Sequence, residues 1–232
     1  MNPVMALFRI LFICFSVIAS AFSQSSDFYI KTFAVENGLS HNQVRSIDQD
    51  HYGFLWIATL DGICRFDGYE FRKYFHDPGD TNTIDHSFLF HTVVDKKDNV
   101  WVVGASAKVA KYNRTFDRFS PINFKFKEIS PGGSIYEITK DNQGNLWGLC
   151  DHGIFSYDSE RDKYIEYPFP EPFPVISNEI TVPRISVDHT GDVWIICFKD
   201  IYHYSWSGSD KYNVRLIYQG HCLIPVSSFM PP

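Results

Sequence analysis

Tryptophan recurs along this sequence at a nearly constant interval, and this repeat leaves few folds open to the chain. Four of the five tryptophans follow one another at intervals of 45, 46 and 47 residues. An aspartate lies six positions before each of them, and a glycine or an aspartate lies three positions before. Repeats of this length are typical of solenoids and propellers. The repeated pairs are Asp50 and Trp56, Asp95 and Trp101, Asp141 and Trp147, and Asp188 and Trp194.

Within each copy, apolar and polar residues alternate with a period of two between turn residues. The first copy reads as four strands, "VRSIDQD", "FLWIAT", "ICRFD" and "YEFRKY", and the other copies follow the same order. Four antiparallel strands in about 45 residues predict an all-β protein, a β-propeller with four-stranded antiparallel blades. The repeated aspartate is expected to accept hydrogen bonds from turn amides, and the tryptophan to fill the space between blades. We therefore assign these pairs structural rather than catalytic roles.

The repeat also predicts the organisation of the chain. The expected segments are a signal peptide over 1–23, a leader over 24–42, four blades over 43–75, 76–120, 121–168 and 169–219, and a link to a missing blade over 220–232.

The first 23 residues have the composition of an export signal. Arg9 is followed by the apolar stretch "ILFICFSVIASAF", and small residues lie around Ala21 and Ser23. An uncleaved membrane anchor is the alternative, but the apolar stretch is shorter than the roughly 20 residues that a spanning helix needs. The mature chain is thus expected to be exported and to have no membrane span. The formal net charge of −6 argues against a nucleic-acid partner.

Four cysteines remain after the signal segment, and their spacing fits no zinc site. Cys150 and Cys197 each lie three residues after a repeat tryptophan, so they occupy equivalent places in neighbouring copies. They either pair as a disulfide in an oxidising compartment or remain buried thiols. No metal or cofactor is expected.

The stretch "ENGLSHNQVRSIDQDHYGFLWIATLDGICRFDGYEFRKY", residues 36–74, resembles the opening blade of the two-component regulator propeller. This family forms the periplasmic sensor region of hybrid two-component system histidine kinases. The resemblance implies a periplasmic location, an oligosaccharide ligand, and a seven-bladed ring of which this chain holds four blades as an N-terminal fragment. It also implies that "DFYIKTF", residues 27–33, is a closing strand whose partner strands are missing, and that the kinase and regulator parts lie outside this chain.

One polar position recurs ten residues before each repeat tryptophan, at the start of the innermost strand. It is occupied by Ser46, His91, Glu137 and Arg184, with His41, Asn42 and Tyr136 expected on the same face. A sugar needs hydrogen-bond partners and aromatic faces, so these seven residues are the candidate ligand-binding set. The alternative is that they only solvate the central channel.

Other functions have weaker support in the sequence. No HExxH or GxSxG motif is present, so no catalytic residues are assigned, although a propeller lyase or glycosidase remains an alternative. A protein-interaction scaffold is a further alternative. An incomplete ring would leave blade faces uncovered, which predicts self-association.

Overall fold

The computed structural model describes residues 29–129, 134–169, 183–197, 200–206 and 212–219. The predicted signal peptide and the predicted link over 220–232 lie outside these ranges. The chain divides into two compact units, Met1–Thr32 and Phe33–Pro232, and every strand belongs to the second unit. Among the described residues, no helix has both the length and the apolar character needed to cross a membrane.

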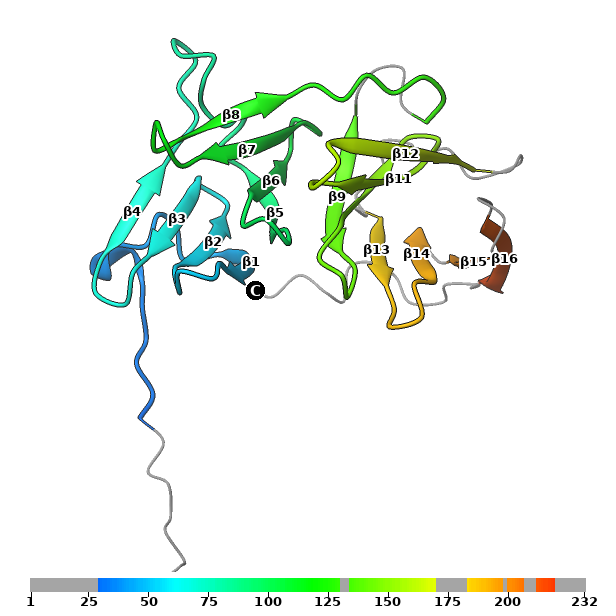
Figure 1. Ribbon diagram of the computed structural model, residues 1–232. Coiled ribbons are helices and arrows are strands. Elements are labelled where there is room, and N and C mark those ends of the chain that lie inside the picture. The colour runs from blue at the N-terminus through cyan, green and yellow to red at the C-terminus, as the bar shows by residue number, and fades with distance from the viewer. Residues whose placement is uncertain (1–28, 130–133, 170–182, 198–199, 207–211, 220–232) are drawn as a thin grey trace, which may run out of the picture. The chain divides into compact units, whose positions relative to one another are not determined.

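The second unit is all-β and consists of four antiparallel sheets of four strands each, which form a propeller (Figure 1). Blade 1 contains β1 (Val44–Gln49), β2 (Leu55–Thr59), β3 (Ile63–Phe66) and β4 (Phe71–Tyr74). Blade 2 contains β5 (Leu89–Val94), β6 (Val100–Gly104), β7 (Val109–Asn113) and β8 (Arg118–Ile122). Blade 3 contains β9 (Ile135–Lys140), β10 (Leu146–Cys150), β11 (Gly153–Asp158) and β12 (Lys163–Pro168). Blade 4 contains β13 (Arg184–Val187), β14 (Val193–Cys197), β15 (Asp200–Trp206) and β16 (Tyr212–Gln219).

Each blade pairs its strands in chain order, so the predicted fold class is confirmed. The helical content of the described residues is limited to a short 3₁₀ turn, η1 (Val35–Asn37), before blade 1.

The turn between the first two strands of each blade explains the repeated glycine. The amide of Gly53 donates to the carbonyl oxygen of Asp50 at 3.0 Å, and φ at Gly53 is 89°. Blade 2 makes the same turn with Asp98, whose φ is 58°. Aspartate is one of the few residues other than glycine that tolerates this left-handed region, so the repeat can use either residue here.

The aspartate and the tryptophan of each repeat are joined by a hydrogen bond. The indole nitrogen of the tryptophan donates to one carboxylate oxygen at 2.9–3.1 Å in all four blades. The other carboxylate oxygen accepts from turn amides; in blade 1 the donor is the amide of Phe54, at 3.0 Å. One carboxylate thus holds both the turn and the buried ring, which explains why the two residues recur together.

Three of the four tryptophans are buried in apolar cores that join consecutive blades. Trp56 packs with residues of blades 1 and 2, Trp101 with residues of blades 2 and 3, and Trp147 with residues of blades 3 and 4. Burial of these large rings between sheets is the main source of cohesion between blades.

The inner strands are also joined by polar contacts. Asp48 of β1 accepts a hydrogen bond from the amide of Val94 of β5 at 2.7 Å. The ammonium group of Lys140 of β9 lies 2.7 Å from the same carboxylate oxygen. This carboxylate therefore connects the inner strands of blades 1, 2 and 3.

The two terminal blades are covered differently from the others. On blade 1, Phe33 and Leu39 pack against Phe66 on the face that lacks a neighbouring blade in the described residues. On blade 4, Trp194 is only half-buried and stacks on the imidazole of His203 at 4.2 Å between ring centroids. In the described part of the chain, no apolar core joins blade 4 to blade 1.

The closing strand predicted over residues 27–33 does not form in the part that the structure describes. Residues 29–33 have no strand assignment, and Tyr29 and Ile30 are 89% and 86% exposed. Phe33 instead packs edge-on against Phe66 and Phe71 at 5.0 and 5.4 Å between ring centroids.

Of the two cysteines that could form a disulfide, the structure describes the side chain of Cys150. Cys150 is fully buried as a free thiol in the core between blades 2 and 3, and burial raises its pKa well above the usual value. The side chain of Cys197 lies outside what the structure describes.

Candidate functional site

Three of the four polar residues predicted at equivalent positions of the inner strands lie in direct contact. His91 of β5, Glu137 of β9 and Arg184 of β13 come from three different blades. A guanidinium nitrogen of Arg184 lies 2.6 Å from Nε2 of His91 and 3.4 Å from a carboxylate oxygen of Glu137. The same oxygen of Glu137 is 3.4 Å from Nε2 of His91. Equivalent positions of three blades thus bring the side chains of His91, Glu137 and Arg184 together. We call these three residues the inner cluster.

Exposure differs strongly within the inner cluster. The side chains of His91 and Glu137 are 14% and 7% exposed, whereas that of Arg184 is 49% exposed. The buried carboxylate also accepts a hydrogen bond from the amide of Ile185 at 2.7 Å. Arg184 is therefore the member best placed to meet a molecule from solvent, with the other two held beneath it.

Burial sets the protonation of the two inner members. It lowers the pKa of His91 to about 4, with the positive charges of Arg184 and Arg45 acting in the same direction. It raises the pKa of Glu137 to about 7, although the hydrogen bond from Ile185 and the charge of Arg184 oppose the shift. At neutral pH the imidazole is uncharged, so its Nε2 can accept the guanidinium hydrogen bond.

The other four candidate residues do not join the inner cluster. The hydroxyl of Ser46 donates to the carbonyl oxygen of Thr92 at 3.2 Å. His41 and Asn42 accept hydrogen bonds from the amides of Gln43 and Val35, at 3.0 and 2.9 Å.

Tyr136 donates its hydroxyl hydrogen to Asp151, and burial together with this bond raises the pKa of the phenol. In the structure, Ser46, His41, Asn42 and Tyr136 therefore all make contacts of their own within the chain.

Sequence reasoning missed Arg45, the exposed residue just before Ser46. Its charge contributes to the low pKa of His91, and its guanidinium lies 5.9 Å from the ring centroid of Phe90. The search by equivalent positions could not find it, because arginine stands at only one of the four repeats at this place. A search for cations next to the repeated polar position would have found it.

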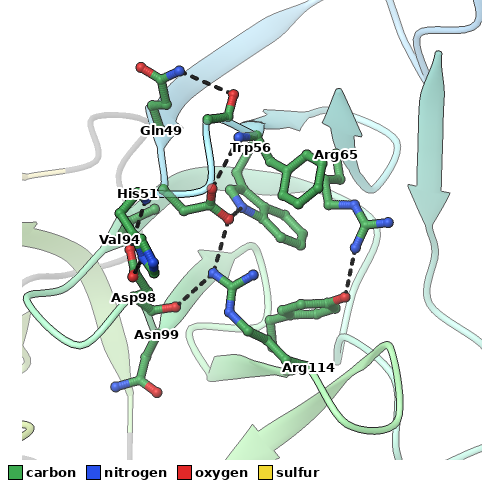
Figure 2. A network of polar contacts seen from close by, with 12 residues as sticks. Gln49, His51, Trp56, Arg65, Val94, Asp98, Asn99 and Arg114 are labelled. Atoms are coloured by element: carbon green, nitrogen blue, oxygen red, sulfur yellow. Dashed lines mark hydrogen bonds and ion pairs between the residues drawn. The ribbon is translucent and has the colours of Figure 1, made fainter. Parts of the chain in front are cut away.

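A second polar network ties blade 1 to blade 2 at the repeated aspartate (Figure 2). The side chain of Asp50 is fully buried, and one of its oxygens accepts from both the Trp56 indole and the Arg114 guanidinium at 2.9 Å. Arg114 also donates to the carbonyl oxygen of Asp98 at 3.1 Å. Burial alone would raise the pKa of Asp50, but the hydrogen bonds from Trp56 and Arg114 lower it below the usual value. The network is structural, since every group in it is already engaged.

A possible metal-binding group occurs on blade 4, where Asp188, Asp192 and His203 place oxygen and nitrogen atoms within 4.8 Å of one another. The Asp188 carboxylate already accepts hydrogen bonds from Trp194 and from the turn residue Thr190. His203 already contacts Asp192 at 3.0 Å. A metal ion would have to displace these contacts, so this group is explained without one.

Similarity to known proteins was found at the sequence and the structure level. Residues 38–61 match the family "Two component regulator propeller", which confirms the resemblance seen in blade 1. A segment of 76 residues is 41% identical to Histidine kinase P4 of Formosa agariphila and covers 30% of this chain. The matched segment is only 6% of that kinase, so this chain spans a small part of its relative.

Solved structures share the fold. One is the extracellular domain of a protein assigned as a hybrid two-component system of B. thetaiotaomicron, with a TM-score of 0.51 and 22% identity over 79% of this chain and 31% of that one. Another is virginiamycin B lyase of Staphylococcus aureus, with a TM-score of 0.52 and 16% identity over 75% of this chain and 55% of that one. An extracellular domain from two-component signalling and an enzyme thus share this propeller architecture, so the fold alone does not decide the function.

Proposed function

We propose that this chain is a periplasmic, ligand-sensing propeller of a two-component signalling system and that it responds to an oligosaccharide. The family match over residues 38–61 and the identity to a histidine kinase over 76 residues support a place in two-component signalling. In this proposal the chain binds without a chemical step of its own, and the kinase and regulator parts belong to the rest of a longer protein.

The observation that carries the proposed site is the convergence of His91, Glu137 and Arg184 from three blades. The half-exposed Arg184 guanidinium offers several donors to solvent, whereas the neutral imidazole of His91 both donates and accepts. Sugar hydroxyl groups also donate and accept, so the inner cluster is chemically suited to them. A ligand held there would contact three blades at once and could change how the blades pack, which is what a sensor requires.

Calorimetric titration of the purified chain with oligosaccharide fractions from plant and algal polysaccharides tests the proposal. Arg184→Ala should weaken binding about tenfold or more, because hydrogen bonds to charged groups contribute about 1.5–3 kcal/mol. Arg118→Ala is the matched control, because Arg118 is an exposed arginine on the outer strand β8.

Two results would overturn the proposal. One is that no fraction binds, or that binding survives Arg184→Ala unchanged. The other is cleavage of a fraction by the chain, detected by chromatography, which would favour a lyase or glycosidase.

A further inference from the structure

A cavity of about 350 Å³ opens between the outer strands of blades 2 and 3, away from the inner cluster. Its volume lies at the lower end of the roughly 300–1,000 Å³ that small-molecule sites occupy, so it suits a single sugar ring. Four aromatic rings line it: Trp101 of β6, Phe124 after β8, Tyr157 of β11 and Tyr164 of β12.

The rings form fixed walls. Phe124 stacks on Trp101 with ring planes 26° apart, and Tyr157 and Tyr164 meet Phe124 edge-on at 5.8 Å between centroids. The Tyr164 hydroxyl donates to the carbonyl oxygen of Lys125 at 2.8 Å, which fixes that ring further. Trp101 and Tyr157 are only 1% and 8% exposed, so the half-buried rings of Phe124 and Tyr164 are the ones that offer surface to a sugar.

The charges of the cavity are not balanced by ion pairs. Within the described part of the chain, the ammonium groups of Lys111 and Lys125 form no ion pair, and the Asn123 amide forms no hydrogen bond. Lys111 lies over the Trp101 ring at 5.2 Å from its centroid. Asp162 accepts from the Tyr157 hydroxyl at 2.7 Å. Two lysines against one carboxylate leave the cavity with an excess of positive charge.

The equivalent place between blades 1 and 2 shows what occupies this site when the chain fills it. Trp56, Tyr74 and Tyr112 are arranged like Trp101, Phe124 and Tyr157, with Tyr74 stacked on Trp56 at 29° between ring planes. There, Asp117 accepts from the hydroxyls of Tyr74 and Tyr112 and pairs with Arg65 and Arg72. Arg65 also donates to the Tyr112 hydroxyl at 3.0 Å.

The site between blades 2 and 3 differs from this filled site at three positions. The register places Lys111 opposite Trp101 as Arg65 lies opposite Trp56. Phe124 stacks on Trp101 as Tyr74 stacks on Trp56, and it lacks the hydroxyl. Ser120 lies opposite Lys111 where Arg72 lies opposite Arg65. The chain thus keeps the aromatic frame but lacks both guanidinium groups and one hydroxyl of the network between blades 1 and 2.

We propose that this cavity is a second ligand site, which binds one sugar ring that carries a carboxylate group. The half-buried rings of Phe124 and Tyr164 receive the ring face, the lysine ammonium groups pair with the carboxylate, and Asn123 and Asp162 meet hydroxyl groups. The site is independent of the inner cluster, because it uses outer strands and other residues.

Ligand-detected NMR titration with glucuronate, and with glucose as the uncharged control, tests this site. Glucuronate should bind at least fivefold more tightly than glucose. Lys111→Arg, Ser120→Arg and Phe124→Tyr together restore the groups of the filled network and should weaken glucuronate binding tenfold or more while the circular dichroism spectrum is kept. Arg118→Lys is the matched control and should leave the affinity unchanged, because Arg118 is exposed on β8 and does not line the cavity.

A separate variant keeps the site testable if the first variant does not fold. Lys125 is exposed, so Lys125→Gln should fold normally and lower the affinity for glucuronate but not for glucose. Equal binding of the two sugars, no binding, or binding unaffected by these changes would overturn the proposal. Loss of glucuronate binding in Arg184→Ala would also overturn it, because the sugar would then sit at the inner cluster.

Discussion

The contact between Asp50 and Arg114 provides the sharpest test of how the blades are joined. In Asp50→Ala, the indole nitrogen of Trp56 loses its acceptor, and this ring is fully buried. A buried donor without a partner costs about 1–3 kcal/mol, and breaking a buried charge pair costs about 3–5 kcal/mol. Because Arg114 is 32% exposed and can reach water, we expect a loss of about 3–4 kcal/mol in the free energy of unfolding.

A double-mutant cycle isolates the part that joins the two blades. Arg114→Met keeps an unbranched stem against Tyr52 and removes the guanidinium that lies 4.8 Å from the Tyr52 ring centroid. The coupling free energy between Asp50→Ala and Arg114→Met should be about 1.5–3 kcal/mol, as for other hydrogen bonds to charged groups.

Urea titration followed by tryptophan fluorescence measures these free energies. A second cycle that pairs Asp50→Ala with Arg118→Ala is the control, and its coupling should be near zero because Arg118 makes no contact with the carboxylate. A coupling below about 0.5 kcal/mol between Asp50 and Arg114 would refute the idea that this ion pair stabilises the interface between blades 1 and 2.

Three further outcomes are expected. In denaturant titrations, Trp147→Ala should lower the free energy of unfolding by about 3–5 kcal/mol, and Trp194→Ala by less than half of that. The reason is that, of these two rings, only Trp147 is buried between two blades. Equal losses would contradict this. The raised pKa of Glu137 contributes stability that is present below pH 4.5 and lost as the pH rises through about 7. The free energy of unfolding of Glu137→Gln should therefore rise relative to that of the wild type between pH 4.5 and about 7 and stay level above that range. Parallel pH profiles would argue against it. Ile47 and Ile196 are 57% and 48% exposed on blades 1 and 4, so we expect the chain to self-associate. The double variant Ile47→Ser with Ile196→Ser should reduce this association, as measured by sedimentation velocity. A wild-type chain that stays monomeric at all concentrations would disprove it.

The repeat allowed the strands to be predicted because its physical causes are local. Alternation of side chains, a turn with positive φ and the Asp–Trp pair all act within one blade, so each copy reports the same structure. The turn at Asp98 followed the pattern although it lacks glycine, because aspartate tolerates the left-handed region.

Contacts between blades were harder to predict. Equivalent positions led to His91, Glu137 and Arg184, but also to Ser46, whose hydroxyl donates to a backbone carbonyl oxygen instead. His41 and Asn42, expected on the same face, form hydrogen bonds only to nearby amides. The position alone does not say which side chains are long enough to meet. The contacts of Arg114 and the cavity beside Phe124 could not be predicted from the sequence, because each depends on residues that differ from blade to blade.

The closing strand predicted over 27–33 depends on contacts of the same kind. Its prediction assumed partner strands that the described part of the chain does not supply, and the alternating pattern by itself cannot provide hydrogen bonds. Residues 29–33 therefore have no strand assignment, and Phe33 packs on blade 1.

The central claim is that the inner cluster binds a sugar. Hydrogen–deuterium exchange with and without a bound oligosaccharide fraction tests this claim most directly. The account predicts slower exchange at the starts of β5, β9 and β13, where His91, Glu137 and Arg184 lie, and no such protection in Arg184→Ala. Binding without protection of these three strands would contradict it.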